Sequence, residues 1–324
     1  MVYNKYIGII GGTGTIGSII VKYLLQLQTH FHVLIGGRRS IKEISMSTFY
    51  NSERLKYNQM NYNNDVELDN FCSQCLLVIN AVGPSFKIND KIALHALRNN
   101  CHYIDIGGYG ILRDLLKPYE KSIEAQKLCF IIGVGWMPGI SGVFSKTIIE
   151  THLNSPENTN FNIYYGAVDN WSYSSTYDLA ASSMGKTRSY VYSHGKEIQV
   201  SPFRYTHHKF FPFIGHKKIC MPSFDEQLTQ LATSLKQIRK ISTFIMLNDY
   251  ISMGKFMFIK IFYKHNLNKA TLMLQDDYQR LVKKENKWGS VICQVSKIEP
   301  ERKIDTFYYC LLYTSPSPRD STSS

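Results

Sequence analysis

The chain has 324 residues, of which 44% are hydrophobic and 19% are charged. This composition excludes a disordered or fibrous chain and is sufficient for one large or two modest domains. The 37 basic and 25 acidic residues give a formal net charge of +12, which favours acidic partners such as phosphorylated cofactors. Because the basic residues are spread thinly, we expect no nucleic acid partner. Salt-sensitive nucleic acid binding is a weak alternative.

The chain contains seven cysteines, an odd number, and most of them lie in apolar runs. This pattern favours buried, reduced thiols and a cytoplasmic location over a disulfide framework. Cys72 and Cys75 form a CxxC pair, but no second CxxC or histidine pair accompanies it. His207, His208 and His216 also lack the spacing of a metal site. We therefore expect no metal centre.

Three apolar stretches raise the question of a membrane segment. Glycines interrupt residues 6–21, and glycines and a proline interrupt residues 128–145, so neither predicts a spanning helix. Residues 241–262 are rich in Met, Phe and Ile, with Asp249 and Lys255 between them. We expect this stretch to form a buried or interfacial helix and no integral membrane segment. A peripheral membrane contact there is left open.

Strands and helices alternate over the first 140 residues. We expect strands at 6–10, 32–35, 76–82, 102–106 and 129–134, and helices at 18–27, 90–99 and 112–127. Strands that are apolar throughout are typical of a parallel sheet with helices on both faces. The order therefore predicts an α/β fold, a doubly wound Rossmann domain, over residues 1–140.

Residues 141–309 have a different texture and predict an α+β substrate or dimerisation domain, with an antiparallel sheet and a possible homodimer. We expect strands at 161–168, 291–298 and 306–309, a hairpin of 190–192 and 197–200, strand and loop at 202–222, and mostly helix at 224–263. The Ser- and Pro-rich residues 310–324 predict a disordered tail that is foreign to the natural protein. We expect the natural chain to continue beyond Tyr309.

The strongest motif is a glycine-rich turn that follows the first strand and opens the first helix. Gly12, Gly14 and Gly17 fit the G-x-G-x-x-G pattern, in the context that dinucleotide binding requires. The residues expected to bind the cofactor here are Gly12, Thr13, Gly14, Thr15, Ile16 and Gly17. The alternative is a glycine-rich turn with a structural role only.

The end of the second strand predicts which dinucleotide is bound. NAD sites usually place an acid there for the ribose hydroxyls, but this chain has Arg38 and Arg39 and no acid before Glu43. A guanidinium is a good partner for the 2′-phosphate of NADP. We therefore predict NADP over NAD, with Arg38 on the phosphate and Arg39 on the adenine. The alternative is two solvated arginines.

Two later strand ends complete the predicted crevice. Val82 and Gly83 end one strand, and we expect them close to the nicotinamide ribose. Asp105 is a single acid within an apolar strand. It is either a structural carboxylate or a site residue, and the sequence does not decide between the two.

Several segments together resemble the NADP-binding domain of the saccharopine dehydrogenase-like reductases. They are residues 11–17, 37–39, 78–84 and 102–108, followed by a Pro-Gly hinge at 135–142. The resemblance implies a Rossmann domain, an NAD(P) cofactor and oxidoreductase chemistry on a C=N or C=C bond of a small molecule. A non-catalytic dinucleotide sensor or scaffold is the alternative.

Hydride transfer also needs a proton donor, because the cofactor supplies only the hydride. We expect the donor in the second region. Tyr173, Tyr177 and Asp178 are candidates in a stretch dense in hydroxyls and acids. The alternative is a polar loop with buried tyrosines, so the catalytic residues are left unassigned.

Overall fold

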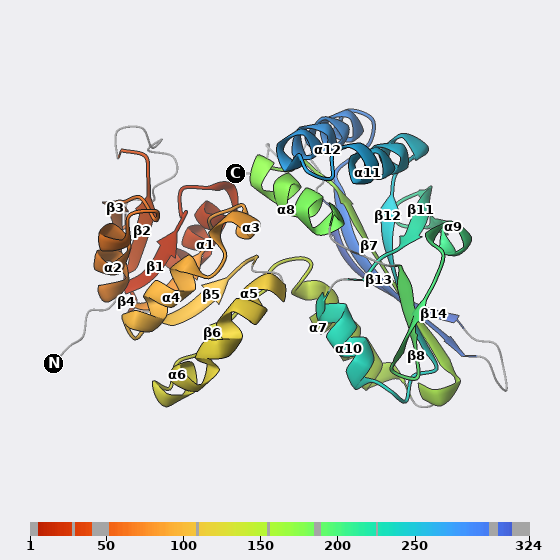
Figure 1. Ribbon diagram of the computed structural model, residues 1–324, viewed down its shortest axis with the longest axis horizontal. Helices are drawn as coiled ribbons and strands as arrows, with labels where there is room; N and C mark the ends of the chain where they lie inside the picture. Colours follow the sequence, from red (N-terminus) through yellow and green to blue (C-terminus); the bar gives the residue numbers. More distant parts are fainter. Residues whose placement is uncertain are drawn as a thin grey trace, which may run out of the picture. The chain divides into compact units, whose positions relative to one another are not determined.

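The computed structural model describes residues 6–27, 30–40, 52–107, 110–153, 156–184, 189–224, 226–297 and 304–312 (Figure 1). The chain forms two compact units, Met1–Gly135 and Trp136–Ser324, called the N-terminal and C-terminal units below. The boundary predicted after residue 140 falls at the start of helix α7 (Ile140–His152). Each unit has its own sheet and its own buried core.

The N-terminal unit is built on a six-stranded sheet in the order β3-β2-β1-β4-β5-β6. Every neighbouring pair of strands is parallel. The strands are β1 (Tyr6–Ile10), β2 (Val33–Gly37), β3 (Leu55–Gln59), β4 (Cys75–Asn80), β5 (His102–Asp105) and β6 (Phe130–Ile131). This order is the doubly wound Rossmann arrangement, so the predicted fold class is confirmed.

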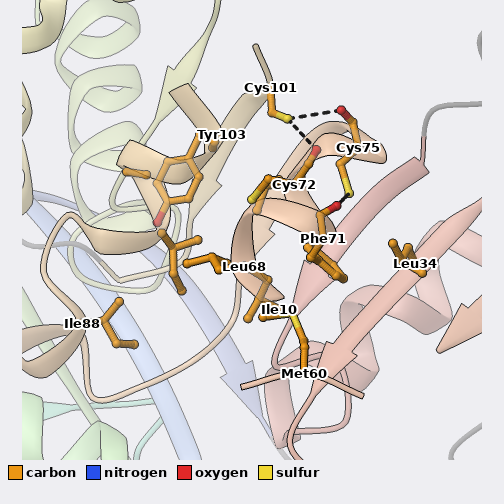
Figure 2. Close-up of a cluster of buried hydrophobic side chains, with 14 of the residues drawn as sticks. Ile10, Leu34, Met60, Leu68, Phe71, Cys72, Cys75, Ile88, Cys101 and Tyr103 are labelled. Atoms are coloured by element: carbon orange, nitrogen blue, oxygen red, sulfur yellow. Dashed lines mark hydrogen bonds between the residues drawn. The ribbon is translucent and has the colours of Figure 1, made fainter. Parts of the chain in front are cut away.

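Helices cover both faces of this sheet. They are α1 (Thr15–Gln26), α2 (Asp65–Ser73), α3 (Ser85–Ile88), α4 (Lys91–Arg98), α5 (Gly110–Leu116), the 3-10 turn η3 (Lys117–Tyr119) and α6 (Glu120–Ala125). On one face, Val21 of α1 packs in a cluster with Ile9 and Ile35. On the other face, Phe71 of α2 belongs to a separate cluster (Figure 2). Ile92 of α4 is buried in the same cluster.

The CxxC pair belongs to this second cluster. Cys72, Cys75 and Cys101 are fully buried and form no disulfide bond within the described residues. The Cys101 sulfur lies 3.1 Å and 3.2 Å from the carbonyl oxygens of Cys72 and Cys75 (Figure 2). Burial raises the pKa of the Cys72 thiol far above its ordinary value. A reactive thiol needs the opposite shift, so the pair has the packing role that the sequence predicts.

β3 and α2 were not predicted from the sequence. α2 nevertheless carries a local start signal. The Asn64 side chain accepts hydrogen bonds from the backbone amides of Val66 and Glu67. Asn64 in turn donates to the Glu67 carboxylate at 2.7 Å. An Asn followed three residues later by Glu is therefore a usable sign of a helix start here.

The C-terminal unit has an eight-stranded mixed sheet in the order β10-β11-β12-β7-β13-β14, with β8 paired to β12 and β9 to β8. The strands are β7 (Thr159–Val168), β8 (Tyr190–Ser193), β9 (Lys196–Gln199), β10 (His207–Phe211), β11 (His216–Pro222), β12 (Lys240–Leu247), β13 (Trp288–Lys297) and β14 (Ile304–Leu312). The β7–β12 pair is parallel, whereas an antiparallel sheet was predicted. The predicted hairpin is present as β8 and β9.

Helices lie on both faces of this second sheet (Figure 1). Besides α7, they are η4 (Pro156–Asn158), α8 (Tyr173–Met184), α9 (Pro202–Tyr205), α10 (Glu226–Ser234), α11 (Tyr250–Phe262) and α12 (Leu267–Val282). α7 and α10 pack on one face, through Ile148 and Leu228. α11 and α12 pack on the other, through Ile259 and Leu274. No helix among the described residues is long and apolar enough to cross a membrane.

The prediction that residues 224–263 are mostly helical is confirmed by α10 and α11, but it missed a strand. The single helix expected over residues 241–262 is wrong, because its first part belongs to that strand. The strand β12 lies in the middle of this stretch, between α10 and α11, and pairs with both β7 and β11. Most of its side chains are buried. A strand buried on both faces lacks the apolar–polar alternation that distinguishes strand from helix, which explains the error.

The last described strand, β14, continues to Leu312, which pairs with Trp288 of β13. It therefore includes the first three residues of the predicted tail, 310–324. Residues 313–324 lie outside the described part of the chain. The substitution of a foreign sequence for the natural one stays a prediction.

Candidate functional site

The glycine-rich turn joins β1 directly to α1. Gly11 has a φ of +83°, a conformation that favours glycine, and its amide donates to the Gly36 carbonyl of β2 at 2.8 Å. The Gly14 amide then donates back to the Gly11 carbonyl at 2.9 Å. These bonds close the turn and set the start of α1 at the carboxyl end of β1.

The glycines of the turn have different packing roles. A Cβ atom on Gly17 would lie 2.2 Å from the Gly11 carbonyl oxygen, and one on Gly12 would lie 2.7 Å from Cγ2 of Ile35. These two positions are too crowded for a side chain. At Gly14, the Gly11 oxygen, at 3.2 Å, is the one atom of the described residues within 4 Å of the added Cβ. Gly14 therefore borders open space, where a ligand can approach the backbone.

The start of α1 is electrostatically suited to an anion. Gly14 is the N-cap and has no side chain to cap the helix, and the first turn contains no acidic residue. Within the described residues, the amides of Thr15 and Ile16 have no backbone acceptor. These free N–H groups and the helix dipole give a positive site. A cofactor diphosphate fits both the charge and the space.

The end of β4 lies next to this turn. A Cβ atom on Gly11 would meet the Ala81 carbonyl oxygen at 2.9 Å and Cγ2 of Val82 at 3.0 Å. β1 and β4 are neighbours in the sheet, but the chain leaves them toward opposite edges, to β2 and to β5. This is the topological switch point at which open α/β sheets bind ligands. The structure thus brings Val82, with Gly83 after it, to the predicted crevice.

Asp105 is the centre of a buried network at the neighbouring strand end. Its carboxylate accepts from the Tyr103 hydroxyl at 2.6 Å, the Asn80 amide at 2.9 Å and the Gly107 backbone at 2.8 Å. Burial raises the pKa of Asp105, and these three hydrogen bonds act against that shift. The Asn80 oxygen also accepts from the Val82 amide at 3.0 Å. Asp105 therefore holds the loops beyond β4 and β5 in place.

The predicted arginine pair directly follows β2. Arg38 and Arg39 are exposed, and neither guanidinium has a hydrogen-bond or ion-pair partner in the described part of the chain. Their backbone is held by β3. The Tyr57 hydroxyl lies within hydrogen-bond distance of the Gly37 and Arg39 carbonyl oxygens, and the Gln59 amide donates to the Arg38 carbonyl at 3.3 Å. The end of β2 therefore presents two guanidinium groups that have no partner among the described residues, on a backbone that β3 holds in place.

The supporting residues escaped the sequence analysis. Asn80 and Tyr103 lie within strands that were predicted, but the sequence does not show that their side chains meet Asp105. Tyr57 and Gln59 belong to β3, which was not predicted. The alternation of polar residues in 55–59 is the signal that could have revealed this edge strand.

The proton-donor candidates of the C-terminal unit lie on α8, a helix where the alternative interpretation of the sequence was a polar loop. Tyr177 and Asp178 are buried, at 8% and 7% exposure. Tyr173 is 37% exposed, and its hydroxyl donates to Asn268 of α12 at 2.9 Å. None of the three lines the cavity of about 480 Å³ in this unit. That cavity is lined by Phe213, Ile214, His216, Val282, Lys283, Lys284, Glu285, Asn286, Lys287 and Trp288.

The histidines considered as metal ligands make other contacts. The His207 ring lies 3.0 Å from the Tyr205 carbonyl oxygen, and the His208 ring lies 2.8 Å from the Tyr250 hydroxyl. The described residues contain no group of three or more His, Cys, Asp or Glu that could hold a metal ion.

Comparison with known proteins supports the assignment of the N-terminal unit. Residues 7–129 match the family model of the saccharopine dehydrogenase NADP binding domain, which confirms the resemblance seen in the sequence. A comparison with curated proteins found no match. The match spans β1 to the residue before β6, so it contains every residue of the crevice described above.

Solved structures show similarity in fold. Apo saccharopine dehydrogenase (L-Glu forming) from Saccharomyces cerevisiae is 14% identical and covers 94% of this chain and 85% of its own, with a TM-score of 0.61. A short-chain dehydrogenase/reductase from Veillonella parvula in complex with NADP is 24% identical over 31% of this chain and 46% of its own, with a TM-score of 0.28. The first similarity extends the fold comparison to both units.

Proposed function

We propose that this chain is an NADP-dependent oxidoreductase that transfers hydride to a C=N or C=C bond of a small molecule. The proposal rests on the family match of residues 7–129 and on the geometry of the crevice. The observation that carries it is the uncapped start of α1 beside Gly14, with two exposed arginines at the next strand end that have no side-chain partner among the described residues. These features together suit a dinucleotide with an additional phosphate.

The choice of NADP over NAD depends on Arg38 and Arg39. The 2′-phosphate of NADP is a dianionic group that a guanidinium binds with two parallel hydrogen bonds. NAD carries hydroxyls at this position, and an exposed arginine gains little from them. Because Tyr57 and Gln59 fix the backbone of this loop, the arginines pay less conformational entropy on binding.

The remaining residues of the crevice orient the cofactor. The free amides at the start of α1 would hold the diphosphate. Val82, which Asn80 and Asp105 hold in place, would lie against the nicotinamide ribose. When bound, the reduced nicotinamide supplies the hydride. Tyr173 is the proton-donor candidate that keeps an exposed side chain, and we propose it for the first test.

Cofactor titrations test the proposal. We expect the wild type to bind NADPH more tightly than NADH. A charge-assisted hydrogen bond contributes about 1.5–3 kcal/mol, so Arg38→Ala should weaken NADPH binding roughly 10- to 150-fold. NADH binding should not change. Arg98→Ala, an exposed arginine on α4, is the matched control and should bind both as the wild type does.

Turnover distinguishes an enzyme from a sensor. NADPH oxidation, followed by absorbance across a panel of imines and enoyl compounds, should reveal at least one substrate. Tyr173→Phe should then lower kcat and leave NADPH affinity unchanged. Tight NADPH binding without turnover on any substrate would favour the non-catalytic sensor. Equal NADPH affinity of wild type and Arg38→Ala would refute the cofactor assignment.

A further inference from the structure

The exposed side of α11 is apolar along its whole length. The exposed residues of this helix are Tyr250, Ile251, Gly254, Phe258, Ile261 and Phe262, and they are called the α11 apolar face below. Ile261 and Phe262 are 64% and 66% exposed. Successive residues of an α-helix turn by about 100°, so all six positions fall within one arc of about 120°. No charged side chain interrupts it.

The α11 apolar face is not used to pack α11 against the core of the C-terminal unit. The opposite side of α11 already packs on the core through Phe256 and Ile259, which are buried with Leu274 of α12. Ser252 on that side donates to Asp277 of α12 at 2.6 Å. An amphipathic surface helix normally turns its second face to water with polar residues. An apolar second face of this size marks an interaction surface.

Between Asp249 and Asp276, the charged residues in and after α11 have one sign. Residues 250–275 contain four lysines and one histidine but no Asp or Glu. Lys255 is neutralised by Asp276 at 2.9 Å and Asp277 at 3.3 Å. Lys264 and Lys269 are exposed and have no carboxylate partner in the described part of the chain. They lie in the loop after α11 and at the start of α12, close in sequence to Ile261 and Phe262.

We propose that the α11 apolar face docks the chain on the surface of an anionic phospholipid bilayer. Its Phe and Ile side chains would enter the boundary between headgroups and acyl chains, and Lys264 and Lys269 would contact lipid phosphates. α11 has 13 residues, which suits a helix lying in the interface. A symmetric contact with a second copy is disfavoured, because it would bring the unpaired lysines of both copies together.

Vesicle flotation with the full chain tests this proposal. We expect the protein to float with phosphatidylcholine vesicles that contain phosphatidylglycerol, and to remain unbound with phosphatidylcholine alone. Each lysine near an anionic surface contributes about 1 kcal/mol, so Lys264→Glu with Lys269→Glu should reduce binding at least about tenfold. Ile261→Ser with Phe262→Ser should reduce it by at least as much. High salt should weaken wild-type binding.

Matched controls separate this surface from general effects. Phe203→Ser removes an exposed aromatic of α9, and Lys117→Glu with Lys121→Glu reverses two exposed charges of the N-terminal unit. Both controls should float as the wild type does. The melting temperature should be unchanged in every variant, which excludes unfolding as the cause of a loss of flotation. Flotation needs neither NADPH nor substrate, so its outcome is independent of cofactor binding and turnover.

Three outcomes would overturn the proposal. The wild type could fail to float with anionic vesicles, or the controls could lose binding as much as the α11 variants do. Alternatively, light scattering could show a wild-type dimer that Ile261→Ser with Phe262→Ser converts to monomer. That last result would assign the face to self-association.

Discussion

The two units differ in the polar groups that stand at their strand and helix ends. In the N-terminal unit, Asp105 fixes loops at the strand ends, and the amides at the start of α1 are left free for a ligand. In the C-terminal unit, the polar side chains between α11 and α12 form hydrogen bonds and ion pairs with one another. Arg280 donates to Asp249 at 2.7 Å and to Asp277 at 2.9 Å, and Ser252 donates to Asp277.

This difference explains why the chemistry of one unit can be inferred and that of the other cannot. Donors without protein acceptors point to an anionic ligand, because backbone N–H groups need a partner. Ion pairs between helices point only to packing. The residues that bind the cofactor are therefore proposed from contacts in the N-terminal unit. The proton donor rests on exposure alone.

The largest expected effect comes from the glycine turn. In Gly17→Ala the new Cβ would lie 2.2 Å from the Gly11 oxygen, so the turn must open. We expect NADPH affinity to fall more than about 100-fold and stability to fall by about 1–3 kcal/mol. Gly14→Ala separates the two effects, because its Cβ meets only one atom, at 3.2 Å. It should lose affinity and keep the wild-type melting temperature.

Fluorescence titration with NADPH and thermal melting by circular dichroism measure the two quantities. Wild-type NADPH affinity in Gly17→Ala would show that the turn does not bind the diphosphate. A loss of stability in Gly14→Ala equal to that in Gly17→Ala would contradict the different packing roles of the two glycines.

The next expected effect comes from the network at the strand ends and concerns stability, not NADPH affinity. Asp105→Ala leaves the Tyr103 hydroxyl, the Asn80 amide and the Gly107 amide without their acceptor. An unsatisfied buried donor costs about 1–3 kcal/mol, so we expect a loss of about 3 kcal/mol or more. All three tryptophans, Trp136, Trp171 and Trp288, lie in the C-terminal unit. Their fluorescence therefore reports on that unit alone.

Urea unfolding of Asp105→Ala should show the transition of the N-terminal unit by circular dichroism at lower urea, with the tryptophan transition unchanged. Asp277→Ala is the matched variant of the other unit and should move the tryptophan transition. If Asp105→Ala shifts the circular dichroism and tryptophan transitions equally, the two units unfold together. Their free energies of unfolding then cannot be compared separately.

Local patterns predicted most of the N-terminal unit. β1, the glycine turn and α1 are contiguous in sequence, so the motif carries its own structural context. The contact of Asn80 with Asp105 joins residues 25 positions apart, and no local pattern encodes it. The strand β12 was missed for a different reason. Its position between β7 and β11 depends on pairing across the whole unit, and this burial removes the alternation that identifies strands.

The smallest expected effect concerns the pH dependence of the α11–α12 cluster. Burial raises the pKa of Asp249, but hydrogen bonds from Arg280 and Ser252 outweigh it and hold the pKa at about 2, against an ordinary value of 3.8. A carboxylate with a lowered pKa in the folded state stabilises the fold above its unfolded pKa. This stabilisation is lost as the pH falls from about 4 toward 2. Allowing for solvent screening, it amounts to about 1 kcal/mol.

Asp249→Asn should therefore be less stable than the wild type above about pH 4, and the difference should shrink as the pH falls toward 2. Urea unfolding followed by tryptophan fluorescence at a series of pH values measures this. Asp114→Asn, an exposed acid of the N-terminal unit, should leave the tryptophan transition unchanged at each pH. If Asp249→Asn is as stable as the wild type at every pH, Asp249 acts through capping of α11 alone, because asparagine and aspartate are equally good N-cap residues.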